Sequence, residues 1–145
     1  MSGDKFRQVA TDFFVAPQLA AADFAAAQAA GIKTIINNRP DGEAGDQLTD
    51  AEARQLAGTN GLDYVFVPVI SGGITADTIA AFASAVADHP GPHLAYCRSG
   101  TRSCHMWAFA TAADRPVRET LEAAAAAGYD LSPALPLIER LSRQP

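Results

Sequence analysis

The sequence has only two cysteines and three histidines, and its apolar runs are short. Two cysteines cannot form a disulfide framework, which favours a reducing, cytoplasmic compartment. No run approaches the roughly 20 apolar residues that a membrane-spanning helix needs, and residues 1–7 lead into no apolar signal region. The histidines and cysteines lack metal-ligand spacing, and no glycine-rich nucleotide loop is present. We therefore expect no membrane association, no metal and no cofactor.

Positive charge is also scarce, because 11 lysines and arginines stand against 16 aspartates and glutamates, for a net charge of −5. An acidic chain is repelled by nucleic-acid phosphates, so nucleic acid is not expected as a partner. The 145 residues are 48% hydrophobic, which excludes disorder and is enough for one folded domain with its own core.

Strand-like and helix-like segments alternate along the chain. β-Branched and aromatic residues predict interior strands at 32–37 and 62–69. A further strand is predicted at 93–96 and a short edge strand at 13–15. A capping box at Thr49 and Glu52, and the cap Thr75, begin two helices. Other helices are predicted at 21–30, 102–113, 117–127 and 133–143. This alternation predicts a three-layer α/β fold with a mostly parallel central sheet flanked by helices.

The segment from Tyr96 to Ser103 runs from a predicted strand through a tight loop into a helix. Ligands bind at this edge of parallel sheets. Main-chain N–H groups of such a loop and the helix N-terminus attract an anion. They also favour a thiolate, the nucleophilic form of cysteine. Cys97 is therefore the predicted nucleophile.

Donors around Cys97 suit an oxyanion. Arg102 offers a planar fork for two oxygens, and Gly100 permits a backbone conformation that a Cβ would obstruct. We expect Ser103 to donate its hydroxyl to the sulfur. For Arg98 at the rim, steering a dianion and solvating the loop both stay open. The predicted anion-binding residues are Arg98, Ser99, Gly100, Thr101, Ser103 and Arg39.

A second loop, Asn37–Glu43, follows another predicted strand and contains the turn signature Pro-Asp-Gly. Here Arg39 would add positive potential for an anionic substrate, and Asp41 is the predicted proton donor. The alternative is a surface turn in which Arg39 forms a solvated ion pair with Asp41 or Glu43.

These two loops, with Val67-Pro68-Val69 and Gly73-Ile74-Thr75 between them, resemble one known family over about residues 8–112. That family is the phosphatase-like domain of beta-lactamase hydrolase-like proteins. The resemblance implies a protein tyrosine phosphatase-like fold and a single catalytic domain over residues 1–145, with C-terminal helices at about 117–143. It also implies a bacterial source and a link to sulfide metabolism through a sulfur dioxygenase-type partner.

The Cys97 loop allows two chemistries on a small oxyanion or phosphorylated substrate. Phosphatase loops have five residues between cysteine and arginine, whereas four separate Cys97 from Arg102, a spacing similar to that of rhodaneses. Tyr96 and Ser71 stand where phosphatases usually carry histidine and the acid aspartate. We therefore expect sulfane-sulfur transfer through a Cys97 persulfide. The first alternative is phosphomonoester or phosphotyrosine hydrolysis through a phosphocysteine, and the second is a non-catalytic anion-binding domain.

The other cysteine, Cys104, lies seven residues beyond Cys97 in the predicted helix. It is either a small buried hydrophobe or a resolving thiol that traps oxidised Cys97 as a disulfide.

Overall fold

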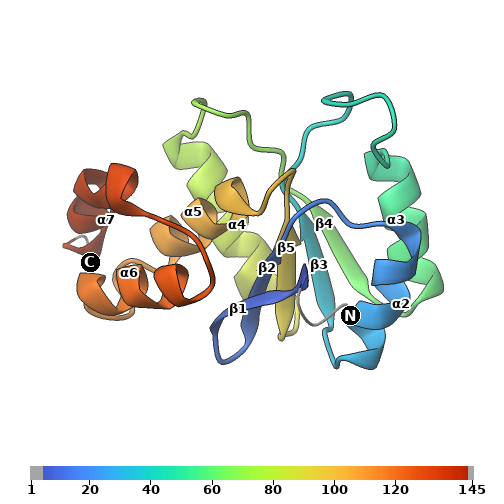
Figure 1. The fold of residues 1–145 in the computed structure, drawn as a ribbon, viewed down its shortest axis with the longest axis horizontal. Helices are drawn as coiled ribbons and strands as arrows, with labels where there is room; N and C mark the ends of the chain where they lie inside the picture. The colour runs from blue at the N-terminus through green and yellow to red at the C-terminus, as the bar shows by residue number, and fades with distance from the viewer. Residues whose placement is uncertain (1–4, 144–145) are drawn as a thin grey trace.

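A five-stranded sheet in the order β1-β2-β5-β3-β4 runs through the computed structural model, which describes residues 5–143 (Figure 1). The strands are β1 (Arg7–Ala10), β2 (Phe13–Ala16), β3 (Thr34–Asn37), β4 (Asp63–Phe66) and β5 (His93–Tyr96). Neighbouring strands from β2 to β4 pair in parallel, and only β1 is antiparallel to its neighbour. The predicted mostly parallel sheet is confirmed.

Two strand positions differ from the prediction. The strand at 13–15 was expected at an edge, but β2 is interior, because β1 pairs with its outer side. Strand β1 was not predicted, because two of its four residues are exposed and its apolar signal is short. Conversely, β4 was expected in the interior and forms an edge. Helix α3 packs against β4, and Tyr64, Val65 and Phe66 are partly buried although one edge of the strand is unpaired.

Helices cover both faces of the sheet (Figure 1). They are α2 (Ala21–Ala29), α3 (Asp50–Thr59), α4 (Ala76–Asp88), α5 (Thr101–Ala110), α6 (Val117–Ala126) and α7 (Leu135–Ser142), with the 3-10 helix η1 (Ser132–Ala134) before α7. One face carries α2 and α3, the other carries α4 and α5, and α6 and α7 pack beyond α5. The predicted three-layer α/β class is confirmed.

Local sequence signals explain where the helices begin. At α3, Thr49 Oγ1 accepts a hydrogen bond from Glu52 N–H at 3.1 Å, and Glu52 Oε1 accepts one from Thr49 N–H at 2.8 Å. This is the predicted capping box. The single helix predicted at 133–143 is instead divided into η1 and α7. Pro136 lies at the second position of α7 and has no N–H, so one continuous α-helical ladder cannot pass through it.

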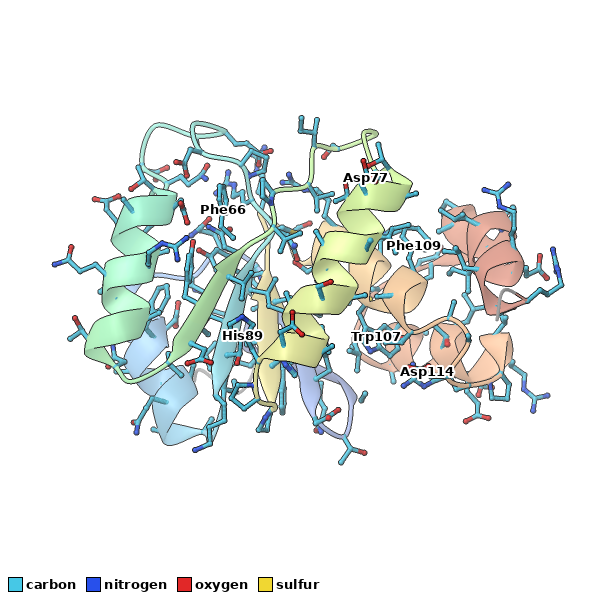
Figure 2. All side chains as sticks on the ribbon, turned by 180° about the vertical axis from the view of Figure 1, so that it is seen from behind. Phe66, Asp77, His89, Trp107, Phe109 and Asp114 are labelled. Atoms are coloured by element: carbon cyan, nitrogen blue, oxygen red, sulfur yellow. The ribbon has the colours of Figure 1, made fainter. Side chains whose placement is uncertain are left out.

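Two apolar layers hold the sheet in place. The layer under α4 and α5 includes Phe82, Met106 and Trp107, each at most 1% exposed. The layer under α2 and α3 includes Phe24 and Leu94, both fully buried. Figure 2 shows Trp107 on α5, between α4 and the C-terminal helices, in the predicted core position. Each such side chain contributes about 1.5–3 kcal/mol through burial, and β5 lies between the two layers.

Among residues 5–143, no helix is both long and apolar enough to cross a bilayer. The same described residues contain no cluster of three or more histidine, cysteine, aspartate or glutamate side chains placed to hold a metal ion.

Candidate active site

The loops that follow β2, β3, β4 and β5 meet at one edge of the sheet, at the top of Figure 1. Because these strands are parallel, their carboxyl ends lie at the same edge, where α/β folds bind ligands. Cys97 follows the central strand β5 directly. The two loops singled out in the sequence, Asn37–Glu43 and Cys97–Ser103, are therefore neighbours in space, as expected.

The loop after β5 wraps around the Cys97 sulfur. Gly100 N–H donates a hydrogen bond to Cys97 Sγ at 3.1 Å. Gly100 has φ of +94°, a conformation that L-residues with a Cβ rarely adopt. A Cβ at this position would also lie 2.1 Å from the hydroxyl oxygen of Tyr129. Gly100 is therefore required both for its backbone conformation and for space.

Tyr129, which follows α6, contacts the backbone of this loop. Its hydroxyl donates a hydrogen bond to the Ser99 carbonyl at 3.2 Å, and only 7% of the residue is exposed. Tyr129 was not predicted as a site residue, because it lies 30 residues beyond Ser99 and no local pattern marks it. Tyr129 thus contacts the Cys97 loop from outside the two loops that the sequence indicated.

Other residues of the loop differ in what they offer an anion. Ser99 Oγ accepts a hydrogen bond from Thr101 N–H at 3.3 Å, so that N–H is already partly used inside the loop. Arg98 is exposed at the rim, as expected, and its carbonyl accepts a hydrogen bond from Gln18 N–H at 3.2 Å. Cys97 itself has no exposed surface.

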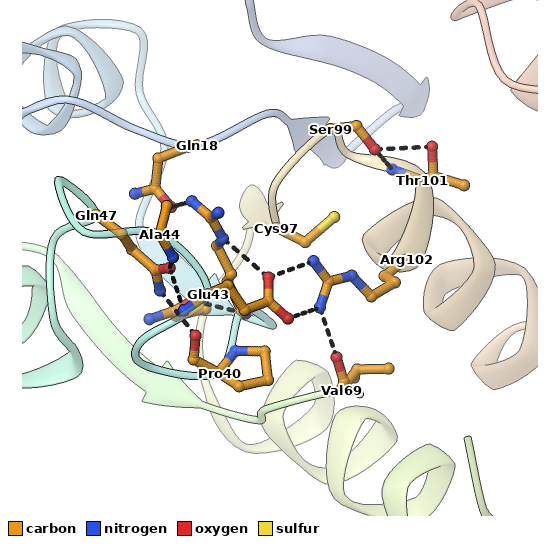
Figure 3. A network of polar contacts seen from close by, with 12 residues as sticks. Gln18, Pro40, Glu43, Ala44, Gln47, Val69, Cys97, Ser99, Thr101 and Arg102 are labelled. Carbon is orange, nitrogen blue, oxygen red and sulfur yellow. Dashed lines mark hydrogen bonds and ion pairs between the residues drawn. The ribbon is translucent and has the colours of Figure 1, made fainter. Parts of the chain in front are cut away.

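The guanidinium of Arg102 holds a carboxylate (Figure 3). Its two terminal nitrogens donate to the two carboxylate oxygens of Glu43, each at 2.8 Å, and one of them also donates to the Val69 carbonyl at 2.8 Å. Hydrogen bonding to Arg102 is the main cause that lowers the pKa of Glu43 to about 2, with burial acting in the opposite direction. In turn, Glu43 raises the pKa of Arg102. Both groups are therefore charged at neutral pH.

Arg39 binds the same carboxylate from the other side. Its Nε donates to Glu43 Oε1 at 3.0 Å, and one terminal nitrogen donates to Gln18 Oε1 at 3.0 Å. The Arg39 side chain is only 5% exposed. Arg39 does form the ion pair with Glu43 that the alternative expected. The pair is not a solvated one, however, because the Arg39 side chain is buried.

Asp41, the predicted proton donor, points to a different partner. Its Oδ1 accepts a hydrogen bond from Asp50 N–H, at the first residue of α3, at 2.8 Å. A carboxylate there also suits the positive end of the helix dipole. The carboxylate on Arg102 is that of Glu43, two residues further along the same loop. A role for Asp41 in proton transfer stays a prediction.

Contrary to the expectation from the sequence, the Ser103 hydroxyl does not donate a hydrogen bond to the Cys97 sulfur. Its hydroxyl donates to Asn38 Oδ1 at 2.8 Å, and Asn38 Nδ2 donates to the Val67 carbonyl at 2.8 Å. A hydroxyl carries one proton, so this bond uses the only one that Ser103 has. The three residues tie together the loops after β5, β3 and β4, a positioning role that sequence spacing does not reveal.

Cys104 lies on α5, and its side chain is fully buried in the apolar layer that also contains Met106 and Trp107. Burial is the main cause that raises the pKa of its thiol to about 12, and the charge of Cys97 adds to the effect. The thiol is therefore protonated at neutral pH. Its surroundings match those of a small hydrophobe in the core, and a resolving role is not needed to explain its position.

This arrangement defines a class of protein. A cysteine directly after the central parallel strand, a glycine N–H on its sulfur and an arginine in the first turn of the next helix characterise cysteine-based, phosphatase-like enzymes. The family model for the phosphatase-like domain of beta-lactamase hydrolase-like protein matches residues 5–114, and the chain belongs to this family. The family expected from the two loops is thereby confirmed.

Relatives with known names agree with this assignment. The chain is 38% identical over 130 residues to the beta-lactamase hydrolase-like protein of Agrobacterium fabrum. That match covers 88% of this chain and 30% of the relative. A similar match to the protein of Xylella fastidiosa is 40% identical over 116 residues, covering 79% and 27%. The chain thus spans less than a third of the length of these curated relatives.

Solved structures share the fold. A candidate phosphatase from Neisseria meningitidis superimposes with a TM-score of 0.84 at 32% identity, covering 97% of this chain and 99% of that one. TpbA of P. aeruginosa, solved in complex with pTyr, superimposes with a TM-score of 0.68 at 14% identity, covering 98% and 90%. The second likeness concerns the fold alone. Together these matches confirm the predicted protein tyrosine phosphatase-like architecture.

Proposed function

We propose that this chain hydrolyses phosphomonoesters, with Cys97 as the nucleophile and Arg102 as the ligand of the phosphoryl oxygens. One observation carries the proposal. Arg102, in the first turn of the helix after Cys97, binds both oxygens of a carboxylate with two bonds of 2.8 Å. Two oxygens of a phosphoryl group present the same pair of acceptors to a guanidinium fork. The further anion ligands in this proposal are Arg98, Ser99, Gly100, Thr101 and Arg39.

The reaction would proceed in two steps. Cys97 Sγ attacks phosphorus, so that an S–P bond forms as the ester P–O bond breaks and the leaving oxygen takes a proton. Water then attacks phosphorus, which breaks the S–P bond, releases phosphate and restores the thiolate. Asp41 is the donor expected from the sequence for the first step.

The kind of substrate follows from the charge of the site. TpbA, which shares this fold, was solved in complex with pTyr. The bidentate fork of Arg102 and the nearby guanidinium of Arg39 favour a phosphate ester or a small oxyanion. We propose this substrate class for the present chain.

Sulfur transfer is the second candidate. It is the function expected first from the sequence, because four residues separate Cys97 from Arg102 as in rhodaneses. The comparisons support the phosphatase alternative better, since the matched family and the similar structures are described as phosphatase-like. A sulfur dioxygenase-type partner belongs to this second candidate, and the remaining length of the relatives would have room for such a domain.

The two candidates differ in which substrate turns over. We expect the purified protein to release p-nitrophenol from p-nitrophenyl phosphate and to form little thiocyanate from thiosulfate and cyanide. Both assays are run on one preparation at matched protein concentration. Thiocyanate formation that exceeds p-nitrophenol release would reverse the order of the two candidates. Binding of phosphate without either turnover would leave the non-catalytic anion-binding domain as the best description.

Arg39 is expected to act on substrate binding more than on chemistry. Arg39→Ala removes one of the two guanidinium groups at the site, so we expect KM for p-nitrophenyl phosphate to rise about tenfold and kcat to change less. Steady-state kinetics measure both quantities. Arg118→Ala, an equal charge change on exposed α6, is the matched control. An unchanged KM in Arg39→Ala would remove this residue from the site.

A further inference from the structure

The Arg102 fork is occupied in the free protein by a group of the chain itself. Glu43 accepts both terminal nitrogens of Arg102 at 2.8 Å and the Nε of Arg39 at 3.0 Å (Figure 3). Since the phosphoryl oxygens of a substrate need the same fork, substrate and Glu43 compete for Arg102. Either the Glu43 carboxylate leaves the site on substrate binding, or it stays beside the substrate.

The structure favours a carboxylate that stays. The side-chain oxygen of Gln47 accepts hydrogen bonds from the main-chain N–H groups of Glu43 and Ala44, at 3.1 and 3.3 Å. Gln47 Nε2 donates to the Pro40 carbonyl at 2.8 Å, which closes this turn on itself. Arg39, itself held by Gln18, keeps its bond to Glu43 Oε1. The backbone and one oxygen of Glu43 are thus held independently of Arg102.

Charge then decides the state of that carboxylate. The charged groups that face it are Arg102 from α5 and Arg39 from its own loop, while Asp41 is turned to the N-terminus of α3. Two positive charges, on Arg102 and Arg39, stand against the single negative charge of Glu43. A dianion on Arg102 would therefore leave this group of charges with an excess of negative charge next to Glu43. It would also remove the two hydrogen bonds from Arg102, which are the main cause of the low pKa of Glu43.

We propose that Glu43 takes up a proton when a dianionic oxyanion binds Arg102, and so becomes the proton donor beside the leaving group. The inference rests on the proposed function, since it assumes that the site accepts a dianion. On attack by Cys97, the proton passes from Glu43 to the leaving oxygen as the P–O bond breaks. The Glu43 carboxylate then returns to Arg102 once phosphate leaves. Free enzyme and substrate complex thus hold the same residue in opposite protonation states.

Calorimetric titration with sulfate tests the proton uptake, because sulfate stays a dianion and is not turned over. The titration uses Cys97→Ser protein, which removes the thiol from the proton balance, in buffers of different ionisation enthalpy at about pH 5.5. This pH lies below the roughly 6–7 that catalytic glutamates reach. We expect up to one proton taken up per sulfate in Cys97→Ser and none in Cys97→Ser/Glu43→Gln, which should bind sulfate about tenfold more tightly. Glu139→Gln on exposed α7 replaces Glu43→Gln in the control protein and should leave the uptake unchanged.

Each outcome has one meaning. Sulfate binding with the same proton uptake in the Cys97→Ser and Cys97→Ser/Glu43→Gln proteins overturns the proposal and leaves the phosphatase function standing. Sulfate binding with uptake lost only in Cys97→Ser/Glu43→Gln supports it, even if no phosphate ester proves to be a substrate. No sulfate binding in either protein contradicts the anion site and both proposals. Circular dichroism serves to check that each variant is folded.

Kinetics of the active protein give a second, independent measure. A poor leaving group such as an alkoxide must receive a proton as the P–O bond breaks, whereas p-nitrophenolate leaves without one. Glu43→Gln should therefore lower kcat about 10²-fold or more for an alkyl phosphate and much less for p-nitrophenyl phosphate. An equal loss for both esters would assign Glu43 a structural role only.

Discussion

Replacement of Cys97 by serine is expected to lower phosphate ester hydrolysis by about 10³-fold or more, because the nucleophile is removed while the rest of the site remains. A serine hydroxyl is a far weaker nucleophile at neutral pH, and no general base lies within hydrogen-bond distance of Cys97 Sγ among the contacts of the described residues. Initial rates with p-nitrophenyl phosphate measure the loss. Oxyanion binding should persist in the variant, since Arg102 and the main-chain N–H groups are unchanged.

The second cysteine provides the matched control. Cys104 is as deeply buried as Cys97, but its side chain lies on α5 within the apolar core. Cys104→Ala should lower the stability by about 1 kcal/mol through lost packing and leave kcat within about twofold. If Cys97→Ser kept most of the activity, the phosphocysteine mechanism would be abandoned. If Cys104→Ala lost activity while still folded, the resolving-thiol hypothesis would return.

Substitution of Gly100 by alanine is expected to disrupt the anion loop. An alanine at φ of +94° costs about 1–2 kcal/mol, and its Cβ would lie 2.1 Å from the Tyr129 hydroxyl oxygen, so one of the two must move. We expect the free energy of unfolding to fall by about 2–4 kcal/mol and kcat/KM to fall about 10²-fold, as the loop shifts from Cys97. Urea unfolding and steady-state kinetics measure the two effects.

Gly31→Ala separates the two causes of this loss. Gly31 has φ of +90° but faces open space, with no atom within 4 Å of a Cβ built there. Its substitution should cost the conformational strain alone, about 1–2 kcal/mol, without any change in activity. An equal loss of stability in Gly31→Ala and Gly100→Ala would mean that Tyr129 yields easily and does not constrain the loop.

Much of the fold was predictable from local sequence. Thr49 and Glu52 mark the start of α3 because both partners of the capping box lie within one helical turn. The position of β4 at the edge was not predictable. An edge strand covered by a helix has the same apolar composition as an interior strand, and strand order depends on pairing between distant segments.

The site was predictable to the extent that it is local in sequence. Cys97, Gly100 and Arg102 lie within six residues of one another, so their spacing alone indicated the anion loop. The choice between Asp41 and Glu43 was not local. Two carboxylates in one turn look alike in sequence, and only the folded backbone turns Asp41 towards α3 and Glu43 towards Arg102. Ser103 was assigned the wrong partner for the same reason, since Asn38 comes from another loop.

The hydrogen bond from Tyr129 to Ser99 joins the Cys97 loop to a part of the chain outside the family-matched span of residues 5–114. The placement of the loop that carries Cys97 therefore depends in part on a residue beyond that span. A fragment cut at the family boundary would keep Cys97, Gly100 and Arg102 and still lose Tyr129.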